Sequence, residues 1–341
     1  MNSTNTYIRG AGMLAFTALA WGAMFTVAKS ALGSIDAYHL SAFRYAPAAT
    51  VMLAILGLVE GKRALRLDGH GWRLAIYGTL GFAGFTILGF LGIAGSTPEH
   101  AAIIVALMPL VTALMNWVLR RRRPSPGTLA AMVVALGGVV LVVTRGHLRL
   151  EGGASWHADA MVLAGVVCWV VYTMGAADVP QFSALRYTAL SMMFGAASIV
   201  AIALVATVAG AASMPTGAAV AATWEEIAYL ALVAGVAAVL AWNAGIGALG
   251  PVNGVLFINL VPITAFAIGV AQGHRFGTAE LAGAAMTLAA LVASNLVTRR
   301  GVVPARSAAI APAAASGDPQ HRSGHARRPI SPSPHAITCR I

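Results

Sequence analysis

Long apolar stretches separated by short polar gaps run from about residue 11 to residue 298. A helix needs about 20 apolar residues to cross the roughly 30 Å hydrocarbon core of a bilayer. Ten stretches approach or exceed that length, and they lack the alternation of polar and apolar residues that is typical of membrane β-strands. They are 11–31, 36–58, 73–93, 98–119, 127–144, 158–176, 184–210, 225–247, 253–272 and 278–298. We therefore predict an all-α polytopic membrane protein with ten transmembrane helices.

The two ends of the chain differ from this pattern. Arg9 precedes the first stretch, as in a signal peptide, but nine more stretches follow and no convincing cleavage site is present, so we interpret this stretch as a retained helix. The last residues are rich in Ala, Pro, Ser, Arg and His, which is typical of a disordered tail. The predicted organisation is a cytoplasmic N-terminus at 1–10, five-helix units at 11–146 and 147–300, and a basic cytoplasmic tail at 301–341.

Positive residues gather on one predicted side of the membrane. That side receives Arg9, Lys62, Arg63, Arg66, Arg73, Arg120 to Arg123, Arg299 and Arg300. The opposite side receives Arg145, Arg149, Arg275 and, at the end of the first stretch, Lys29. Because positively charged loops remain in the cytoplasm, we expect a multi-pass protein of the inner membrane with both termini in the cytoplasm.

The chain repeats itself at three places in the same order. Ser41-Ala-Phe-Arg44-Tyr45 recurs as Ser183-Ala-Leu-Arg186-Tyr187, Trp72 and Tyr77 recur as Trp224 and Tyr229, and Ala106-Leu-Met-Pro109 recurs as Asn259-Leu-Val-Pro262. The order predicts two copies of five helices. Since five is an odd number, the second copy enters the membrane from the opposite side. Two inverted five-helix repeats are the arrangement that supports alternating access in many secondary transporters.

Composition and charge exclude several other classes. Charged residues make up 10% of the chain and hydrophobic residues 58%, whereas soluble domains carry about a quarter charged residues. The net charge of +11 lies in short gaps and in the tail, so we expect no nucleic-acid partner. Cys168 and Cys339 cannot build a disulfide framework, and no metal-ligand spacing or ATP-binding loop occurs. We therefore expect no metal and no cofactor.

Several of these motifs together resemble the drug/metabolite transporter superfamily, and within it the ten-helix EamA-type members. They are Trp21-Gly22 followed by Lys29, Phe43-Arg44, Pro109 and Cys168-Trp169. The resemblance covers about residues 10–298. It implies a secondary transporter whose helices one, three, four, six, eight and nine line a central cavity. The family pattern has a glutamate just after helices four and nine, and here those places hold Arg120 to Arg123 and Gly273-His274-Arg275.

Two arginines lie at equivalent repeat positions, Arg44 in the second stretch and Arg186 in the seventh. A charge at the centre of a bilayer costs about 2.5–3.5 kcal/mol on insertion scales. One interpretation makes these arginines binders of an anion or carboxylate. Their symmetric placement favours the other, in which each reaches an interface beside a tyrosine of the aromatic belt.

Three further side chains are candidates for a role in charge or proton transfer. Lys29 either attracts a substrate carboxylate or is an ordinary interfacial lysine. Glu99 and His100 open the fourth stretch. The acid complements the helix dipole there, and the adjacent histidine makes a proton relay the alternative hypothesis.

Pro109 and Pro262 lie at equivalent places within the fourth and ninth stretches. Each frees the carbonyl four residues earlier, at Val105 and Ile258. In lipid such a carbonyl needs a partner or a water-filled cavity, so the prolines predict a central site at the repeat interface, with a plain packed kink as the alternative. Nearby polar residues that we assign to this site are Thr112, Asn116 and Asn259.

Aromatic residues supply the apolar walls of substrate pockets. By the resemblance, the candidates for the cavity wall are Trp21, Trp169, Tyr172, Trp242 and Asn243, and Phe25 shares a face with Trp21. Any one of them could instead pack or face lipid. Glycines recur in the third stretch, among them Gly78 and Gly89, and we expect them to bring helices close together.

The resulting hypothesis is a secondary transporter that moves a small molecule by rocking one half against the other. By the resemblance, its cargo is amino acids or similar amphipathic metabolites and its direction is export. Drug or toxic-compound efflux is the alternative. An intramembrane enzyme would need a constellation such as paired acids in the interiors of the stretches or an HExxH metal motif, and the sequence offers neither. A scaffold whose basic tail contacts lipid headgroups is a third class. We expect membrane lipids as partners, protons as the candidate coupling ion, and a monomer or weak oligomer.

Overall fold

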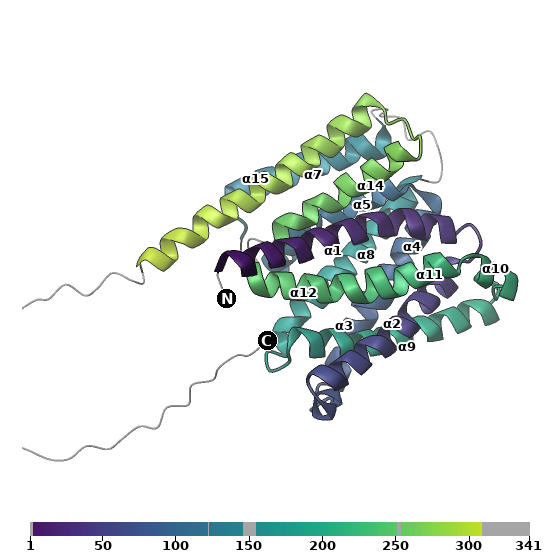
Figure 1. The fold of residues 1–341 in the computed structure, drawn as a ribbon. Helices are drawn as coiled ribbons and strands as arrows, with labels where there is room; N and C mark the ends of the chain where they lie inside the picture. Colours follow the sequence, from purple (N-terminus) through teal and green to yellow (C-terminus); the bar gives the residue numbers. More distant parts are fainter. Residues whose placement is uncertain (1–2, 122, 146–154, 251–253, 309–341) are drawn as a thin grey trace, which may run out of the picture. The chain divides into compact units, whose positions relative to one another are not determined.

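The computed structural model describes residues 3–121, 123–145, 155–250 and 254–308, and this part of the chain is helical without any β-strand (Figure 1). The elements of the first half are α1 (Ser3–Ala31), α2 (Ala37–Val59), η1 (Lys62–Leu65), α3 (Gly71–Gly78), η2 (Thr79–Gly84), α4 (Phe85–Gly95), α5 (Pro98–Ala106), α6 (Met108–Arg120) and α7 (Pro126–Thr144). Those of the second half are α8 (Ser155–Gly175), η3 (Ala176–Asp178), α9 (Ala184–Val208), α10 (Gly217–Ala222), α11 (Trp224–Ala228), η4 (Tyr229–Ala237), α12 (Ala238–Leu249), η5 (Val255–Asn259), α14 (Leu260–Ala271) and α15 (Thr278–Ala308).

Each of the ten predicted stretches coincides with helical structure. Seven continuous helical stretches in the described residues are long and apolar enough to cross a membrane. The pair α5 and α6 makes an eighth span if it is counted as one, and the apolar helices 256–271 and 278–294 are shorter. The protein is thus a helical, multi-pass membrane protein.

The C-terminal boundary of the helical part differs from the prediction. Helix α15 continues to Ala308, so the first residues of the predicted disordered tail are helical. An established helix gains one hydrogen bond per added residue, although Gly301 and Pro304 of this segment are poor helix formers. The rest of the predicted tail lies outside the described residues. The described residues up to Gly301 belong to one compact unit, and a second unit begins at Val302.

Side-chain caps explain where many of the helices begin. Asp36 accepts hydrogen bonds from the backbone N–H groups of Tyr38 and His39 at the start of α2. A hydroxyl accepts the equivalent bond at the start of four more helices. These hydroxyls belong to Thr97 before α5, Ser125 before α7, Ser183 before α9 and Thr216 before α10.

Glycines allow several helix pairs of the first unit to pack backbone against backbone. A Cβ atom added to Gly78 in α3 would lie 2.0 Å from the carbonyl oxygen of Ser191 in α9. One added to Gly138 in α7 would lie 2.6 Å from the carbonyl oxygen of Gly283 in α15. Small residues at such crossings favour helix association in lipid. This confirms the expected role for Gly78, whereas Gly89 has nothing within 4 Å of its added Cβ and faces open space.

The backbone departs from α-helical geometry within four membrane stretches. Residues Thr79–Gly84 and Tyr229–Ala237 are π-helical, and Val255–Asn259 form a 3₁₀ turn. Helices α5 and α6 meet at Leu107 with a bend of 43°. Irregular backbone at membrane depth is tolerated where it is buried in protein or lines a cavity, and π-helical turns often mark functional sites.

Candidate functional site

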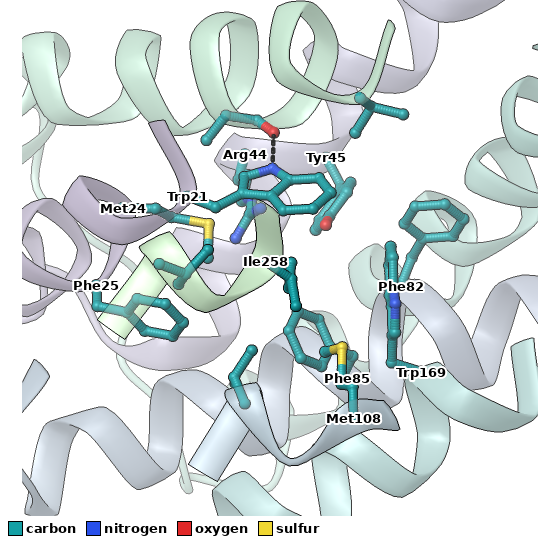
Figure 2. A pocket seen from close by; sticks show the side chains of 14 residues that line it. Trp21, Met24, Phe25, Arg44, Tyr45, Phe82, Phe85, Met108, Trp169 and Ile258 are labelled. Carbon is teal, nitrogen blue, oxygen red and sulfur yellow. Dashed lines mark hydrogen bonds between the residues drawn. The ribbon is translucent and has the colours of Figure 1, made fainter. Parts of the chain in front are cut away.

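A small cavity lies among the irregular segments, in the middle of the bundle (Figure 2). Its volume is about 50 Å³. Elements of both halves line it, and η2, η4, η5 and both sides of the α5–α6 bend each contribute at least one residue. The lining residues are Trp21, Met24, Phe25, Arg44, Tyr45, Phe82, Phe85, Val105, Met108, Trp169, Ala234, Val239, Ile258 and Val261.

Aromatic rings form much of the cavity wall. The indole N–H of Trp21 donates to the carbonyl oxygen of Ala234 at 3.1 Å, which fixes the ring across from η4 (Figure 2). The ring of Trp169 in α8 contacts Phe82 and Phe85, with centroids 6.0 Å and 5.1 Å away. The indole groups of Trp21 in α1 and Trp169 in α8 thus face one cavity.

Arg44 is the charged residue among those that line the cavity. Its exposed fraction is 4%, and its Nε atom has no hydrogen-bond partner in the structure. The guanidinium lies 4.8 Å from the ring centroid of Tyr45 and 5.7 Å from that of Phe90. Within the described residues no carboxylate lies at ion-pair distance from it. Arg44 therefore does not reach an interface, and it presents a positive charge to an aromatic cavity (Figure 2).

Arg186 occupies the equivalent repeat position but has a different environment. Its guanidinium donates to Asp68 at 2.6 Å and to the carbonyl oxygen of Arg66 at 2.6 Å, and it lies over the ring of Phe182. The bond to Arg186 lowers the pKa of the Asp68 carboxyl below its ordinary value. Arg186 is thus neutralised at a surface loop, as the structural interpretation expects.

Two of the other predicted wall residues contact residues that line the cavity. Trp242 packs on Trp21 with centroids 5.4 Å apart, and Tyr172 packs on Trp169 with centroids 5.1 Å apart and stacks on Tyr187. Asn243, a predicted wall residue, and Asn259, predicted as a polar neighbour, each hold a buried polar atom, Nδ2 and Oδ1, for which the structure gives no hydrogen-bond partner. None of these four residues is itself among the lining residues.

Pro109 and Pro262 are not among the lining residues, but each lies close in sequence to residues that are. Pro109 is the second residue of α6 and Pro262 the third of α14. Val105 and Ile258, whose carbonyls the prolines were expected to free, both line the cavity. Two polar neighbours do not line it, because each bonds within its own helix. Thr112 donates to the carbonyl oxygen of Met108, and Asn116 to that of Thr112.

Sequence reasoning missed most of the apolar lining residues. Met24, Phe82, Phe85 and Met108 resemble any other residues of a membrane helix, so their chemistry gives no signal. Phe82 and Phe85 do lie within a glycine-rich stretch, and its irregular geometry brings them to the cavity.

A second polar group gathers at the end of the bundle where α1 ends and α2 and α5 begin. We call this the Glu99 end. Lys29 lies there and donates to the carbonyl oxygens of Ile93, Ala94 and Ser96 at 2.8–2.9 Å. It thus caps α4, as an interfacial lysine does. Glu99 and His100 are almost fully buried beside it.

Two acids missed in the sequence complete this group. Asp159 in α8 and Glu280 in α15 are buried on either side of His100. Both lie in the first turn or two of their helices, where an acid is ordinary. The sequence did offer one indication that these residues lie near each other, because the predicted topology begins the fourth, sixth and tenth stretches on the same side of the membrane.

At the opposite end of the bundle, the α2–α3 loop contacts the α8–α9 loop. Besides the Arg186–Asp68 pair, the hydroxyl of Ser183 donates to Glu60 at 2.5 Å, and Gln181 contacts His70. Tyr77 donates to Asp178. These polar contacts are exposed, and they join the two halves.

The structure defines a multi-pass helical membrane protein whose two halves enclose a central aromatic cavity. Residues 8–144 match the EamA-like transporter family. The chain is 33% identical over 288 residues to the uncharacterized transporter YrdR of Bacillus subtilis (strain 168), which covers 83% of this chain and 89% of that protein. The chain belongs to the EamA-like transporter family, a branch of the drug/metabolite transporter superfamily, and is a membrane transporter.

Two other similarities are more distant. The chain is 24% identical over 285 residues to a protein of Streptantibioticus cattleyicolor named as a probable terminal-alkyne amino-acid exporter, over 83% of this chain and 92% of that one. A crystal structure at 21% identity superposes with a TM-score of 0.59 and covers 87% of this chain and 98% of its own. The latter shows a shared fold.

Proposed function

We propose that this protein is a secondary transporter that exports small amphipathic metabolites such as amino acids by alternating access. It crosses the inner membrane ten times as two inverted five-helix repeats. Both termini lie in the cytoplasm, and the Glu99 end faces outward. Each of the two halves contributes one wall of the cavity, and rocking between them opens it to either side.

The packing of the helices supports the inverted repeats. Under this proposal the sixth stretch is the copy of the first, and the third is the copy of the eighth. The first stretch packs against the eighth (α1 on α12), and the sixth packs against the third (α8 on α4). The second and seventh stretches, which are copies of each other, also pack together (α2 on α9). The π-helical segments η2 and η4 fall in the third and eighth stretches, at equivalent places.

Arg44 is the observation that carries the cargo proposal. Taking an ion out of water costs several kcal/mol unless it is paired, and the described residues give Arg44 aromatic faces but no acid. A carboxylate cargo supplies the missing charge through charge-assisted hydrogen bonds. The surrounding rings suit an apolar side chain on the same molecule. A relative is named for the export of amino acids that carry an apolar alkyne, which agrees with this cargo.

The size of the cavity supports a conformational cycle. Pockets for small molecules measure about 300–1,000 Å³, and this cavity measures about 50 Å³. Cargo binding therefore requires the walls to separate, which the bend at Leu107 and the irregular turns allow. In the proposed cycle, a contracted state between loading and release accounts for this small volume.

Uptake into proteoliposomes with a pool of labelled amino acids tests this function. We expect accumulation above protein-free vesicles, and a loss of roughly 30-fold in Trp169→Ala, since truncating a central aromatic residue costs about 2 kcal/mol. Trp72→Ala is the matched control, because Trp72 is 64% exposed and lies outside the cavity. Equal losses in both variants, or no accumulation by folded protein, would contradict the proposal. Movement of neutral or cationic drugs instead would favour efflux.

A further inference from the structure

His100 lies buried between two carboxylates that belong to two other helices. Its Nδ1 atom is 3.7 Å from Asp159 Oδ2 in α8, and its Nε2 atom is 3.8 Å from Glu280 Oε1 in α15. The exposed fraction of His100 is 4%, and neither ring nitrogen has a hydrogen-bond partner in the structure. The ring therefore faces an acid on each edge.

The two acids are themselves held in place. Ser96 donates to Asp159 Oδ1 at 2.5 Å. The backbone N–H of Gly277 donates to Glu280 Oε2 at 2.8 Å, and Arg145 Nε lies 3.3 Å from Glu280 Oε1. Carboxylates fixed in this way keep their oxygens at the histidine, which is a preorganised arrangement.

Several charged and titratable groups surround His100 in the part of the chain that the structure describes. Glu99, Asp159 and Glu280 are buried acids there, and Arg145 and Lys29 are cations at the same end. His274 lies 3.4 Å from Glu99 and is half-exposed, so it is a second titratable base in contact with these acids. His157 and Arg275 are exposed on neighbouring segments. Of these bases, His100 is the one that lies between two carboxylates of other helices.

We propose that His100, with Asp159 and Glu280, is a proton-binding site that controls opening at the Glu99 end. A neutral imidazole carries one N–H and can donate to one acid only, whereas the protonated ring donates to both. The proton adds to a ring nitrogen, and no other bond forms or breaks. Protonation thereby joins α5 of the first half to α8 and α15 of the second half.

The expected consequence is that the proton closes this end and its loss opens it. This step rests on the proposed alternating access, in which the two halves separate at one end at a time. A ligand shifts such an equilibrium only by its different affinity for the two states. Here the difference is the second hydrogen bond, which forms only when the helices are together.

Two measurements on the full chain test the proposal, with protons as the probe. The first is an NMR titration of ¹⁵N-labelled histidines in the purified protein, in which His100→Gln identifies the His100 signal. We expect the His100 signal to change between the singly and the doubly protonated form within the range from about pH 5.5 to about pH 8.5 that the second measurement uses. Asp159→Asn and Glu280→Gln should each change the pH at which this happens. A His100 signal that is the same throughout that range would overturn the proposal, as would a signal whose change disappears with EDTA, which would indicate a metal ion.

The second measurement follows the conformation of the protein. Val105→Cys, in a Cys168→Ser and Cys339→Ser background, places a thiol in the cavity for an impermeant maleimide applied outside cells. We expect labelling at least about fivefold faster at about pH 8.5 than at about pH 5.5, the lower bound of typical coupling between sites. In His100→Gln the labelling should be fast at both pH values.

His39 provides the matched control. It is also a buried histidine at this end, but its Nδ1 atom bonds Asp36 of its own helix start at 2.6 Å, so it does not join acids of two other helices. His39→Gln should keep the pH dependence, and loss of the pH dependence in His39→Gln but not in His100→Gln would reverse the assignment. The NMR titration needs no cargo. It therefore separates a failure of this site from a failure of the transport proposal.

Discussion

Replacing Arg44 by methionine should make the folded protein more stable and the transporter less active. Methionine is unbranched and apolar, so it can fill the space of the arginine stem between Tyr45 and Phe90. The substitution removes a buried cation for which the described residues provide no acid. Stability and activity then change in opposite directions, which a purely structural arginine would not cause.

The structure gives the approximate size of both effects. Burial of an ion costs several kcal/mol even after relaxation, and contact with aromatic faces returns about 2 kcal/mol when the cation is desolvated. The net gain on substitution is therefore about 1–3 kcal/mol. A hydrogen bond to a charged group contributes about 1.5–3 kcal/mol, so the variant should bind a carboxylate cargo roughly 10- to 150-fold more weakly.

Thermal unfolding of the purified protein and uptake of labelled amino acids into proteoliposomes measure the two effects. Arg186→Met is the control at the equivalent repeat position. It removes the hydrogen bond to Asp68 and leaves only the longer 3.7 Å contact with Arg66, so it should lower stability and leave cargo selectivity unchanged. An Arg44→Met protein that unfolds earlier than the parent and transports carboxylates at the parental rate would refute the reasoning.

Three further predictions follow from particular contacts. Gly78→Ala should destabilise the protein by about 1–3 kcal/mol, because the added Cβ would meet the backbone at Ser191. Gly89→Ala places its Cβ in open space and should gain up to about 1 kcal/mol from helix propensity, and thermal unfolding of both variants measures the two changes in stability. Arg186 holds the pKa of Asp68 below its unfolded value, so the contribution of this carboxylate to stability is present above about pH 4 and is lost as the pH falls through the lower folded pKa. Asp68→Asn should remove that part of the acid sensitivity, which unfolding curves between about pH 3 and about pH 6 measure. Truncation after Ala308 should leave uptake unchanged, because every residue assigned to the cavity and to both ends precedes it; an inactive truncation would show that the basic tail takes part in transport.

The sequence was sufficient for the positions of the helices, because a bilayer requires long apolar stretches and few other arrangements satisfy the backbone. Pro109 and Pro262 also predicted interruptions in the fourth and ninth stretches, and a break lies just before each of them. The exact breaks were less predictable. The bend lies at Leu107, and the ninth stretch begins with a 3₁₀ turn before Pro262.

The environments of the polar groups could not be predicted from the pattern of any single helix. Arg44 and Arg186 occupy matching sequence positions, and only the packing makes one a buried cavity residue and the other a partner of Asp68. Asp159 and Glu280 each look like an ordinary acid at a helix start. Their association with His100 depends on three helices meeting, which no local pattern records.

The two ends of the bundle differ in how they meet solvent, and this has a practical consequence. The contact of Asp68 with Arg186 of α9, and those of Glu60 and His70 with the α8–α9 loop, are exposed, so dissolved ions screen the charged pair among them. The carboxylates around His100 are buried and are screened much less. Raising the ionic strength should thus weaken the contacts at the end of the bundle that holds Asp68 and leave those at the Glu99 end intact. Under the proposed alternating access, salt concentration then offers a way to populate the state that is open at the end with Asp68, without any substitution in the protein.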